Sequence, residues 1–293
     1  MEFLKYKNFV LNEQTKLVNL ETINEAALTA TPDKGVKFGI CITTYKIDSG
    51  GRQNHMSTEK VLRECLESVK AQSWPEWKVY IMGDAYPQEE WPEIEKLAAS
   101  IVPKDKLWMD NLKTPGERDK YDGSIPHLTG GNTAANATIA QMKKDGIKYF
   151  ARLDHDDAWK TDHLKTHATA YTQYPEVVYS LTQARKKRVK GDTGSYMYFP
   201  DKGTYENAEN NYTLGLGGQC HSAMTWKMEP LKYIKYRTWD QQKATQPRRK
   251  ECFPGDWDNT ERIKRIVEDD SNKHSMIYIP KLTVKYRNSE GKF

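Results

Sequence analysis

The sequence has no long apolar run and few cysteines. None of its 293 residues lie in a stretch approaching the roughly 18 apolar residues that a membrane-spanning helix needs, and the mean hydropathy is -0.85. The N-terminal MEFLKYKNFVLNEQ lacks the apolar core of a signal peptide. Four cysteines are scattered without a CxxC pair, which disfavours a zinc site or a disulfide framework. These absences predict a soluble, cytoplasmic protein with free thiols.

Apolar and polar residues alternate in a way that predicts an α/β fold. Hydrophobic residues make up 37% of the chain, enough for a sizeable core. Strand-like and helix-like segments follow one another, which is typical of an open, mostly parallel sheet flanked by helices. The predicted strands are 36–45, 77–84 and 147–154, and the predicted helices are 57–74, 91–101 and 131–146.

The second half of the chain is less regular, and one main domain is expected. It reads as a helix over 163–175, a strand over 177–190, loops over 196–219, a strand near 217–226, a helix over 256–270 and a final strand pair over 276–287. A change of pattern near residue 35 predicts an N-terminal extension, 1–35, of short strands and a linker. The main domain is then 36–293, with a first half over 36–157 and a second half over 158–293.

Three aspartates follow the apolar run of the strand 147–154. Asp154, Asp156 and Asp157 lie where a buried strand leaves the sheet, and the carboxyl ends of such strands form the ligand crevice of α/β folds. In an extended chain residues two apart point the same way, so Asp154 and Asp156 should share a face, with His155 turned away. Two such carboxylates favour a hard cation, Mg2+ or Mn2+, that also binds a substrate's phosphates. A solvated turn with helix-capping aspartates is the alternative.

Other acidic and histidine motifs fit this spacing poorly. An EF-hand would need an oxygen ligand where the chain has Ala158 and a glycine where it has Trp159. A phosphatase with an aspartyl nucleophile would carry its DxD after the first strand; it stays an alternative, which predicts phosphate release from simple esters without a nucleotide. His163 and His167 have i, i+4 spacing but no HExxH glutamate, so a surface-facing pair is expected.

Basic residues gather in two runs although the formal net charge is only +5. ARKKRVKG spans 184–191 and KATQPRRK spans 243–250. A solvated loop is the plain interpretation of each run, and a polyanionic partner is the other. The candidate contacts for such a partner in this half are Arg185, Lys186, Lys187, Arg188, His221, Trp257 and Arg287.

The order of the motifs resembles that of the GT-A fold glycosyltransferases of family 2, from about Lys37 to Arg287. ICITTYK resembles the family's first strand, VYIMGDAY the strand that usually ends in Asp-Asp-Gly-Ser, and GGNTAANATIAQ the segment that usually carries Ala-Arg-Asn. Gly83 and Ala135 stand where the family has an aspartate and the arginine. By this likeness the nucleotide-sugar contacts are Thr43, Thr44, Tyr45, Asp84, Asn136 and Asp154.

The resemblance also gives roles to the acidic motifs. YFARLDHDDAW resembles the metal-binding DxD, which implies Asp154 at the donor's ribose or the metal and Asp156 on the metal under the diphosphate. Asp157 receives no role. FPGDWDNTERI resembles the segment that carries the catalytic base, so Asp256 is the implied base, with Gly255 in place of the family's glutamate. An N-cap of the following helix is the other interpretation of Asp256.

The C-terminal VKYRNSEG resembles a Tyr-Arg-x-His stretch without its histidine. Tyr286 and Arg287 are kept, and His274 or Lys285 are the candidates to replace the missing imidazole. The family likeness implies an inverting, metal-dependent transfer of a sugar from a nucleotide diphosphate donor, with a UDP-sugar expected. It makes 36–157 the nucleotide-sugar-binding half and 158–293 the acceptor-binding half with the catalytic base. The candidate contacts named above for a polyanionic partner are then contacts of the acceptor or the diphosphate. The acceptor is expected to be a hydroxyl of a glycan or lipid-linked glycan, and hydroxylated bases in DNA are the second reading. A non-catalytic nucleotide-sugar binding module is the alternative of another class.

Overall fold

A single mixed sheet organises the chain. The computed structural model describes residues 18–47, 56–116, 130–187, 196–199, 211–214, 220–245, 254–269 and 273–287. The strands are β1 (Val18–Thr22), β2 (Phe38–Thr44), β3 (Trp77–Gly83), β4 (Leu107–Asn111), β5 (Tyr149–Arg152), β6 (Ala158–Trp159), β7 (Val177–Lys187), β8 (Tyr196–Phe199), β9 (Asn211–Leu214), β10 (Met224–Lys227) and β11 (Ser275–Tyr286). Their order is β4-β3-β2-β5-β10-β7-β11-β1-β9, with β6 on β11 and β8 on β7.

The sheet is mostly parallel along this path, as predicted. Five of the eight pairings are parallel, and the antiparallel ones are β5 with β10, β10 with β7, and β1 with β9. Because β10 is antiparallel to both of its neighbours, its N-terminal end lies beside the C-terminal end of β5 and the middle of β7. The end of β5 and the start of β10 therefore lie side by side in the middle of the sheet.

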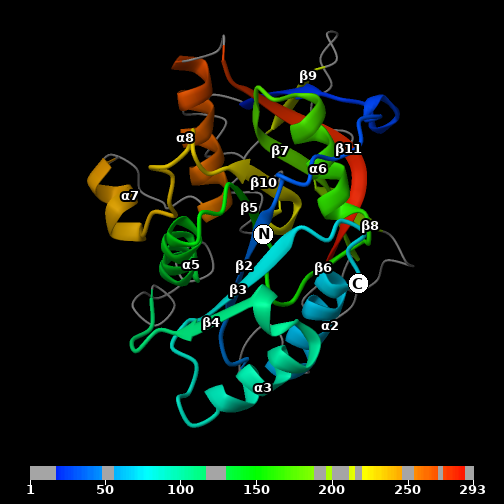
Figure 1. Cartoon of the computed structure of the whole chain (residues 1–293). Helices are drawn as coiled ribbons and strands as arrows, with labels where there is room; N and C mark the ends of the chain where they lie inside the picture. Colours follow the sequence, from blue (N-terminus) through cyan, green and yellow to red (C-terminus); the bar gives the residue numbers. More distant parts are fainter. Residues whose placement is uncertain are drawn as a thin grey trace.

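Helices cover both faces of the sheet. They are α2 (Thr58–Lys70), α3 (Trp91–Ile101), α5 (Asn132–Lys144), α6 (His163–Gln173), α7 (Trp239–Thr245) and α8 (Gly255–Asp269), with short 3-10 turns at Glu25–Ala27, Lys104–Lys106 and His221–Ala223. In Figure 1, α5, α7 and α8 lie on one side of the sheet and α2, α3 and α6 on the other. Ser57 caps α2, because its side chain accepts a hydrogen bond from the Lys60 amide at 3.3 Å.

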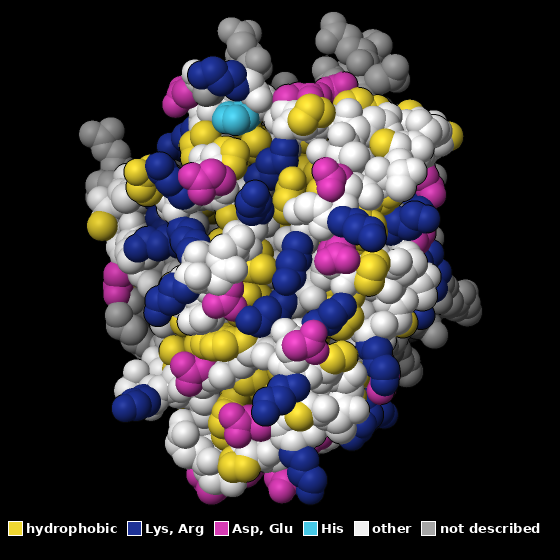
Figure 2. Space-filling model, in the orientation of Figure 1, with side chains coloured by type: hydrophobic (Ala, Val, Ile, Leu, Met, Phe, Trp, Pro, Cys, Tyr) yellow, Lys and Arg dark blue, Asp and Glu magenta, His cyan; other side chains and the backbone are white. Residues whose placement is uncertain are grey.

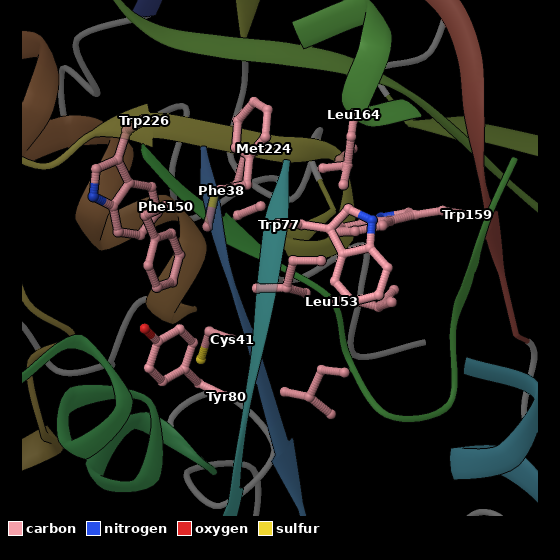
Figure 3. Packing of buried hydrophobic residues seen from close by; sticks show 14 of the residues in the cluster. Phe38, Cys41, Trp77, Tyr80, Phe150, Leu153, Trp159, Leu164, Met224 and Trp226 are labelled. Carbon is pink, nitrogen blue, oxygen red and sulfur yellow. The ribbon is translucent and has the colours of Figure 1, made fainter. Parts of the chain in front are cut away.

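The core follows the apolar strands. Phe150 of β5 stacks on Trp226 of β10 with ring centroids 3.8 Å apart, which packs the two strands that lead to the aspartate motif (Figure 3). Cys41, Cys65 and Cys220 are buried and free, as predicted; Cys252 lies outside the described residues. Figure 2 shows Lys and Arg side chains spread over one face, with acidic and apolar side chains between them.

Several sequence-based assignments are wrong. The region predicted as loops over 196–219 contains β8 and β9, and β4, β6 and α7 were not predicted. The predicted final strand pair is one strand, β11, whose pairing with β7 is irregular between Tyr278 and Leu282, around Pro280. Part of the predicted N-terminal extension belongs to the sheet, because β1 pairs with both β11 and β9.

Candidate active site

The three aspartates lie in a turn at the end of β5. The strand ends at Arg152, and the amide of Asp157 donates to the carbonyl oxygen of Asp154 at 2.9 Å. This bond joins the first and fourth residues of a β-turn, so the expectation that Asp154 and Asp156 share the face of an extended strand is wrong. His155 is buried, and its Nδ1 lies 2.8 Å from Thr44 Oγ1 at the end of β2.

Asp154 is held from three directions. Its Oδ1 accepts a hydrogen bond from Arg152 Nε at 3.0 Å, and its Oδ2 lies 3.6 Å from His221 Nδ1. Its backbone amide donates to Ser222 Oγ at 3.0 Å. Burial opposes ionisation of this carboxyl, but the charge of Arg152 and the hydrogen bond from His221 hold the pKa of Asp154 below its usual range. The residue is therefore a fixed carboxylate, with 27% of its side chain exposed.

Asp157, which had no predicted role, ties three segments together. Its Oδ2 accepts from Ser222 Oγ at 2.6 Å, and its Oδ1 accepts from the backbone amide of Arg287 at 3.0 Å. Burial, followed by the charges of Asp156 and Asp154, raises the pKa of Asp157 well above its usual value. The side chain thus joins the turn to the start of β10 and the end of β11.

Arg287 also braces the turn. Its Nε donates to the carbonyl oxygen of Asp156 at 2.7 Å, and its guanidinium forms an ion pair with Glu64 of α2. The side chain is only 3% exposed. The structure therefore places Arg287, predicted as an acceptor or diphosphate contact, inside the chain against the aspartate turn.

The predicted nucleotide-binding residues meet at the ends of β2 and β3. The amide of Asp84 donates to the carbonyl oxygen of Thr44 at 2.7 Å, and Asp84 Oδ1 accepts from the amide of Gly116 at 3.0 Å. Tyr45 packs on His155 with ring centroids 4.9 Å apart. Thr43 lies against Gly131, where a Cβ would come within 2.8 Å of Thr43 Oγ1. The ends of β2 and β3 therefore contact each other and the aspartate turn, and the side chains of Thr44 and Asp84 are buried there.

Asn136, predicted as a nucleotide-sugar contact, forms two hydrogen bonds with the backbone of Tyr236. Its Nδ2 donates to the carbonyl oxygen of Tyr236 at 2.7 Å, and its Oδ1 accepts from the Tyr236 amide at 2.8 Å. The Asn136 side-chain amide therefore pairs with the backbone of Tyr236, which precedes α7. Ala135 is fully buried in the core.

Asp256 lies in the first turn of α8, close to the aspartate turn. It is 8% exposed, and its Oδ1 accepts from the Trp257 amide at 2.8 Å. Tyr236 lies between the two acidic motifs: its ring centroid is 4.7 Å from the Arg152 guanidinium carbon and 5.7 Å from that of His221, and a Cβ on Gly255 would lie 3.1 Å from its Cδ1. The fold therefore packs the start of α8 and the residues that hold Asp154 against the same side chain.

The neighbours of Asp256 on α8 serve packing. Asp258 is buried between Arg237, whose guanidinium binds it by two nitrogens, and Arg262, whose Nε lies 3.1 Å away. Trp257, a predicted contact, is 1% exposed, and its Nε1 has no hydrogen-bond partner within the described chain.

The basic run reaches the same edge of the sheet. Arg185 and Lys186 are partly exposed near the end of β7, and Lys186 Nζ lies 4.8 Å from the ring centroid of Tyr286. Lys285 pairs in register with Arg185. The Lys187 side chain and the whole of Arg188 lie outside the described residues.

His221 supplies an imidazole next to the Asp154 carboxylate. His274 precedes Ser275, which pairs with Val177 at the start of β7. It therefore lies at the N-terminal ends of β7 and β11, away from the aspartate turn that follows the C-terminal end of β5. The suggestion that His274 replaces the family's histidine is therefore wrong. His163 and His167, predicted at the surface, are fully buried, and their Nδ1 atoms lie 2.7 Å from Thr283 Oγ1 and 2.8 Å from Ser180 Oγ. Burial lowers the pKa of His167 to about 3.

The donor set suits a cation that is shared with a ligand. Among the described residues no three His, Cys, Asp or Glu side chains are grouped so that they would hold a metal ion. Mg2+ and Mn2+ are commonly held by one or two carboxylates with substrate phosphates and water completing the shell. Asp156, partly exposed beside the fixed Asp154, fits such a site.

Sequence reasoning missed Arg152, Tyr236 and Asn132. Arg152 is 3% exposed and lies under the Tyr236 ring, with its guanidinium carbon 4.7 Å from the ring centroid. An arginine within the apolar run YFARLD was a usable signal, since arginine is almost never fully buried without a partner. Tyr236 and Asn132 carry no such signal, because only long-range packing brings them to the site.

This arrangement is that of the GT-A glycosyltransferase fold, and solved structures confirm it. S. aureus TarS 1-349 matches 86% of this chain and 60% of its own with a TM-score of 0.53 at 18% identity. A mannosyltransferase from Pyrobaculum calidifontis, solved in complex with GDP-Man and Mn2+, matches 97% of this chain and 64% of its own with a TM-score of 0.50 at 11% identity. The predicted fold class is thus confirmed.

Sequence comparison points to the same class. An uncharacterised glycosyltransferase of Acanthamoeba polyphaga mimivirus is 33% identical over 149 residues, which are 51% of this chain and 56% of the relative. The chain therefore spans little more than half the length of that curated relative. No family model matches the chain. Among the described residues no helix is long and apolar enough to cross a membrane.

Proposed function

We propose that the chain is an inverting, metal-dependent glycosyltransferase that moves a sugar from a nucleotide diphosphate donor, a UDP-sugar, to an acceptor hydroxyl. The observation that carries this proposal is that Tyr236 contacts Arg152 and His221, which hold Asp154, and also packs against Gly255, the residue before Asp256. One carboxylate motif for the leaving group and another for the nucleophile are what a single displacement at a sugar carbon requires. Structures of S. aureus TarS with UDP and with UDP-GlcNAc support a nucleotide-sugar ligand for this fold.

The residues divide the chemistry between them. Thr43, Thr44, Tyr45 and Asp84 hold the nucleotide where β2 and β3 end. Asp156 would hold Mn2+ or Mg2+, and the bound ion would supply positive charge beside the departing diphosphate. Asp256 takes the proton of the incoming hydroxyl, a role that needs a carboxylate within hydrogen-bond reach of the attacking oxygen. Asn136 and Asp157 position the surrounding segments.

The acceptor is proposed to be a glycan or lipid-linked glycan. DNA with hydroxylated bases is the second candidate, favoured by Arg185 and Lys186 at the edge of the sheet that carries the site. Binding to duplex DNA would fall with salt and would fall further when these two residues are neutralised. Salt-independent binding, or none, would remove DNA from consideration.

A thermal-shift screen tests the proposal. UDP, GDP, UDP-GlcNAc and GDP-Man are each added with and without Mn2+, and at least one nucleotide with Mn2+ should stabilise the chain. A ligand at a hundred times its Kd adds about 2.7 kcal/mol, which corresponds to a rise in Tm of several degrees. Asp156→Asn should abolish the Mn2+-dependent part of the shift.

The same screen separates the alternatives. No stabilisation by any nucleotide would contradict the proposal. Stabilisation without any donor cleavage, even after prolonged incubation, would favour a binding module. Phosphate release from simple esters without a nucleotide would favour the phosphatase alternative.

A further inference from the structure

The turn that follows β10 presents an exposed tyrosine among lysines. Leu231 and Ile234 are buried and anchor this turn to the core. Between them Tyr233 is 81% exposed, and it is the only exposed large hydrophobic side chain in the described part of the chain. A single exposed aromatic residue is ordinary on a protein surface, so its surroundings decide what it can bind.

Lysines of α5 and of the loop after it lie beside this turn. Lys143 Nζ donates to the carbonyl oxygen of Lys232, and the Met228 amide donates to the carbonyl oxygen of Lys148 at 2.8 Å. Together with Tyr233, the exposed lysines of this surface form what we call the lysine patch. These lysines are Lys143, Lys144, Lys148, Lys232 and Lys235.

The positive charge of the lysine patch is not neutralised within the described residues. None of its five lysines forms an ion pair with a carboxylate there. Asp145, in the loop after α5, is engaged elsewhere, because its Oδ2 accepts from Lys78 at 2.6 Å and from the Tyr80 hydroxyl at 2.8 Å. Glu229, the exposed acidic residue of the turn itself, offsets one of the five charges. The surface therefore attracts anions.

These features fit an anionic lipid surface better than a nucleic acid. Every cation of the patch is a lysine, which meets phosphate as a point charge and lacks the planar fork with which arginine reads phosphates and bases. Lys232 Nζ lies 5.3 Å from the centroid of the Tyr233 ring, so one face of the ring is covered and no base stacks there. Tyrosine is instead enriched at the headgroup level of membranes, and clustered lysines bind anionic lipids.

We propose that the lysine patch docks the chain onto an anionic lipid surface, with the ring of Tyr233 at the headgroup level. The patch lies at the C-terminal end of α5 and beside the start of β5, whereas the aspartate turn follows the end of β5. Docking therefore uses none of the residues assigned to the donor, and it does not depend on the proposed function. It holds the chain at the kind of surface that carries a lipid-linked acceptor.

Co-sedimentation of the full chain with vesicles tests the patch. Vesicles of phosphatidylcholine with about 30% phosphatidylserine should bind the wild type, and vesicles of phosphatidylcholine alone should bind it at least about tenfold more weakly. A quadruple variant, Lys144→Gln, Lys148→Gln, Lys232→Gln and Lys235→Gln, should lose at least about tenfold in affinity for the anionic vesicles. Tyr233→Ser alone should lose about threefold, because the ring no longer enters the headgroup layer.

Four lysines on the other side of the sheet supply a matched control. Lys60 and Lys70 of α2, Lys96 of α3 and Lys104 after it are exposed, and α2 and α3 lie on the opposite side of the sheet from α5 (Figure 1). Changing all four to glutamine removes the same formal charge as the patch variant. Because salt screens charges beyond about 10 Å, vesicle binding should stay within about twofold of the wild type.

Three outcomes would overturn the docking proposal. The first is equal loss in the two quadruple variants, which would show an effect of net charge alone. The second is equal binding to neutral and anionic vesicles, or binding to neither. The third is wild-type binding to duplex DNA but not to vesicles, with the DNA binding lost in the patch variant, which would assign the patch to nucleic acid. Nucleotide binding in the thermal-shift screen is measured without lipid, so this proposal and the proposed function fail separately.

Discussion

Ala85 has a strained backbone next to a residue assigned to the nucleotide. Its φ of 52° is positive, and no other non-glycine residue in the described part of the chain has a positive φ. It follows Asp84, whose carboxylate accepts from Gly116. Tyr86 is fixed beyond it, because Asn111 donates to its carbonyl and accepts from its amide. The tight path between Asp84 and Tyr86 explains why the left-handed conformation persists.

Ala85→Gly should raise the free energy of unfolding by about 0.5–1 kcal/mol. Glycine removes the Cβ strain of the left-handed conformation, and this gain exceeds the entropy that glycine adds to the unfolded chain. Urea denaturation measures the change. Ala71→Gly, at an ordinary φ of -78°, should instead lower the value. Equal losses in both variants would contradict the strain at Ala85.

Single residues of the site were predictable where the chemistry is local. Asp154 and Asp156 were predicted because carboxylates that follow a buried strand have a clear chemical use, and Asp256 was implied only by the resemblance. Gly83 stands where the family has an aspartate, and local sequence does not explain the difference. A Cβ at this position would lie 2.3 Å from Asn111 Oδ1, so an aspartate side chain does not fit. The roles of Arg152 and Asn136 likewise depend on partners that no spacing in the sequence reveals.

At the scale of elements, α5 and α8 meet at their N-terminal ends. A Cβ on Gly255 would lie 2.7 Å from Asn132 Oδ1 and 3.1 Å from Tyr236 Cδ1. Asn132 also donates to the carbonyl of Arg237 at 3.0 Å. The start of α8, and with it Asp256, is therefore positioned by direct contact with the start of α5, and this explains why a glutamate does not occupy position 255.

Gly255→Ala should lower stability by about 1–3 kcal/mol, because the added methyl group overpacks this junction. Asn132→Ala in the same chain should recover part of the loss by making room. Denaturation of the two single variants and the double variant gives the coupling energy. Additive losses would show that the two helices do not press on each other at this point.

Elements with a strong pattern were predicted, and elements fixed by pairing were not. The buried strands β2, β3 and β5 and the amphipathic α2 follow from apolar periodicity. The edge strands β4 and β9 are short, and only their neighbours make them strands. A strand pair was predicted over 276–287, but β11 is one strand whose pairing with β7 passes Pro280 through a local irregularity.

At the scale of the whole molecule, the antiparallel insertion of β10 creates the site. It places His221 and Ser222, just before β10, beside the turn that follows β5. It also leaves β7 and β11 parallel with their C-terminal ends at the same edge. The order of motifs predicted the fold class, but the insertion that joins its two halves depends on long-range strand pairing.

In the proposed reaction the aspartate turn serves the departing diphosphate and Asp256 takes the proton of the incoming hydroxyl. Turnover and donor affinity of an Asp256 variant test this assignment. Asp256→Asn keeps the Oδ1 acceptor for the Trp257 amide but cannot take a proton. With Mn2+ and the nucleotide sugar that gives the largest thermal shift, release of the nucleoside diphosphate should fall about 10²–10⁴-fold in this variant. Donor affinity should stay within about twofold, since Asp256 makes no ground-state contact that the account requires. Wild-type turnover in Asp256→Asn would contradict the account.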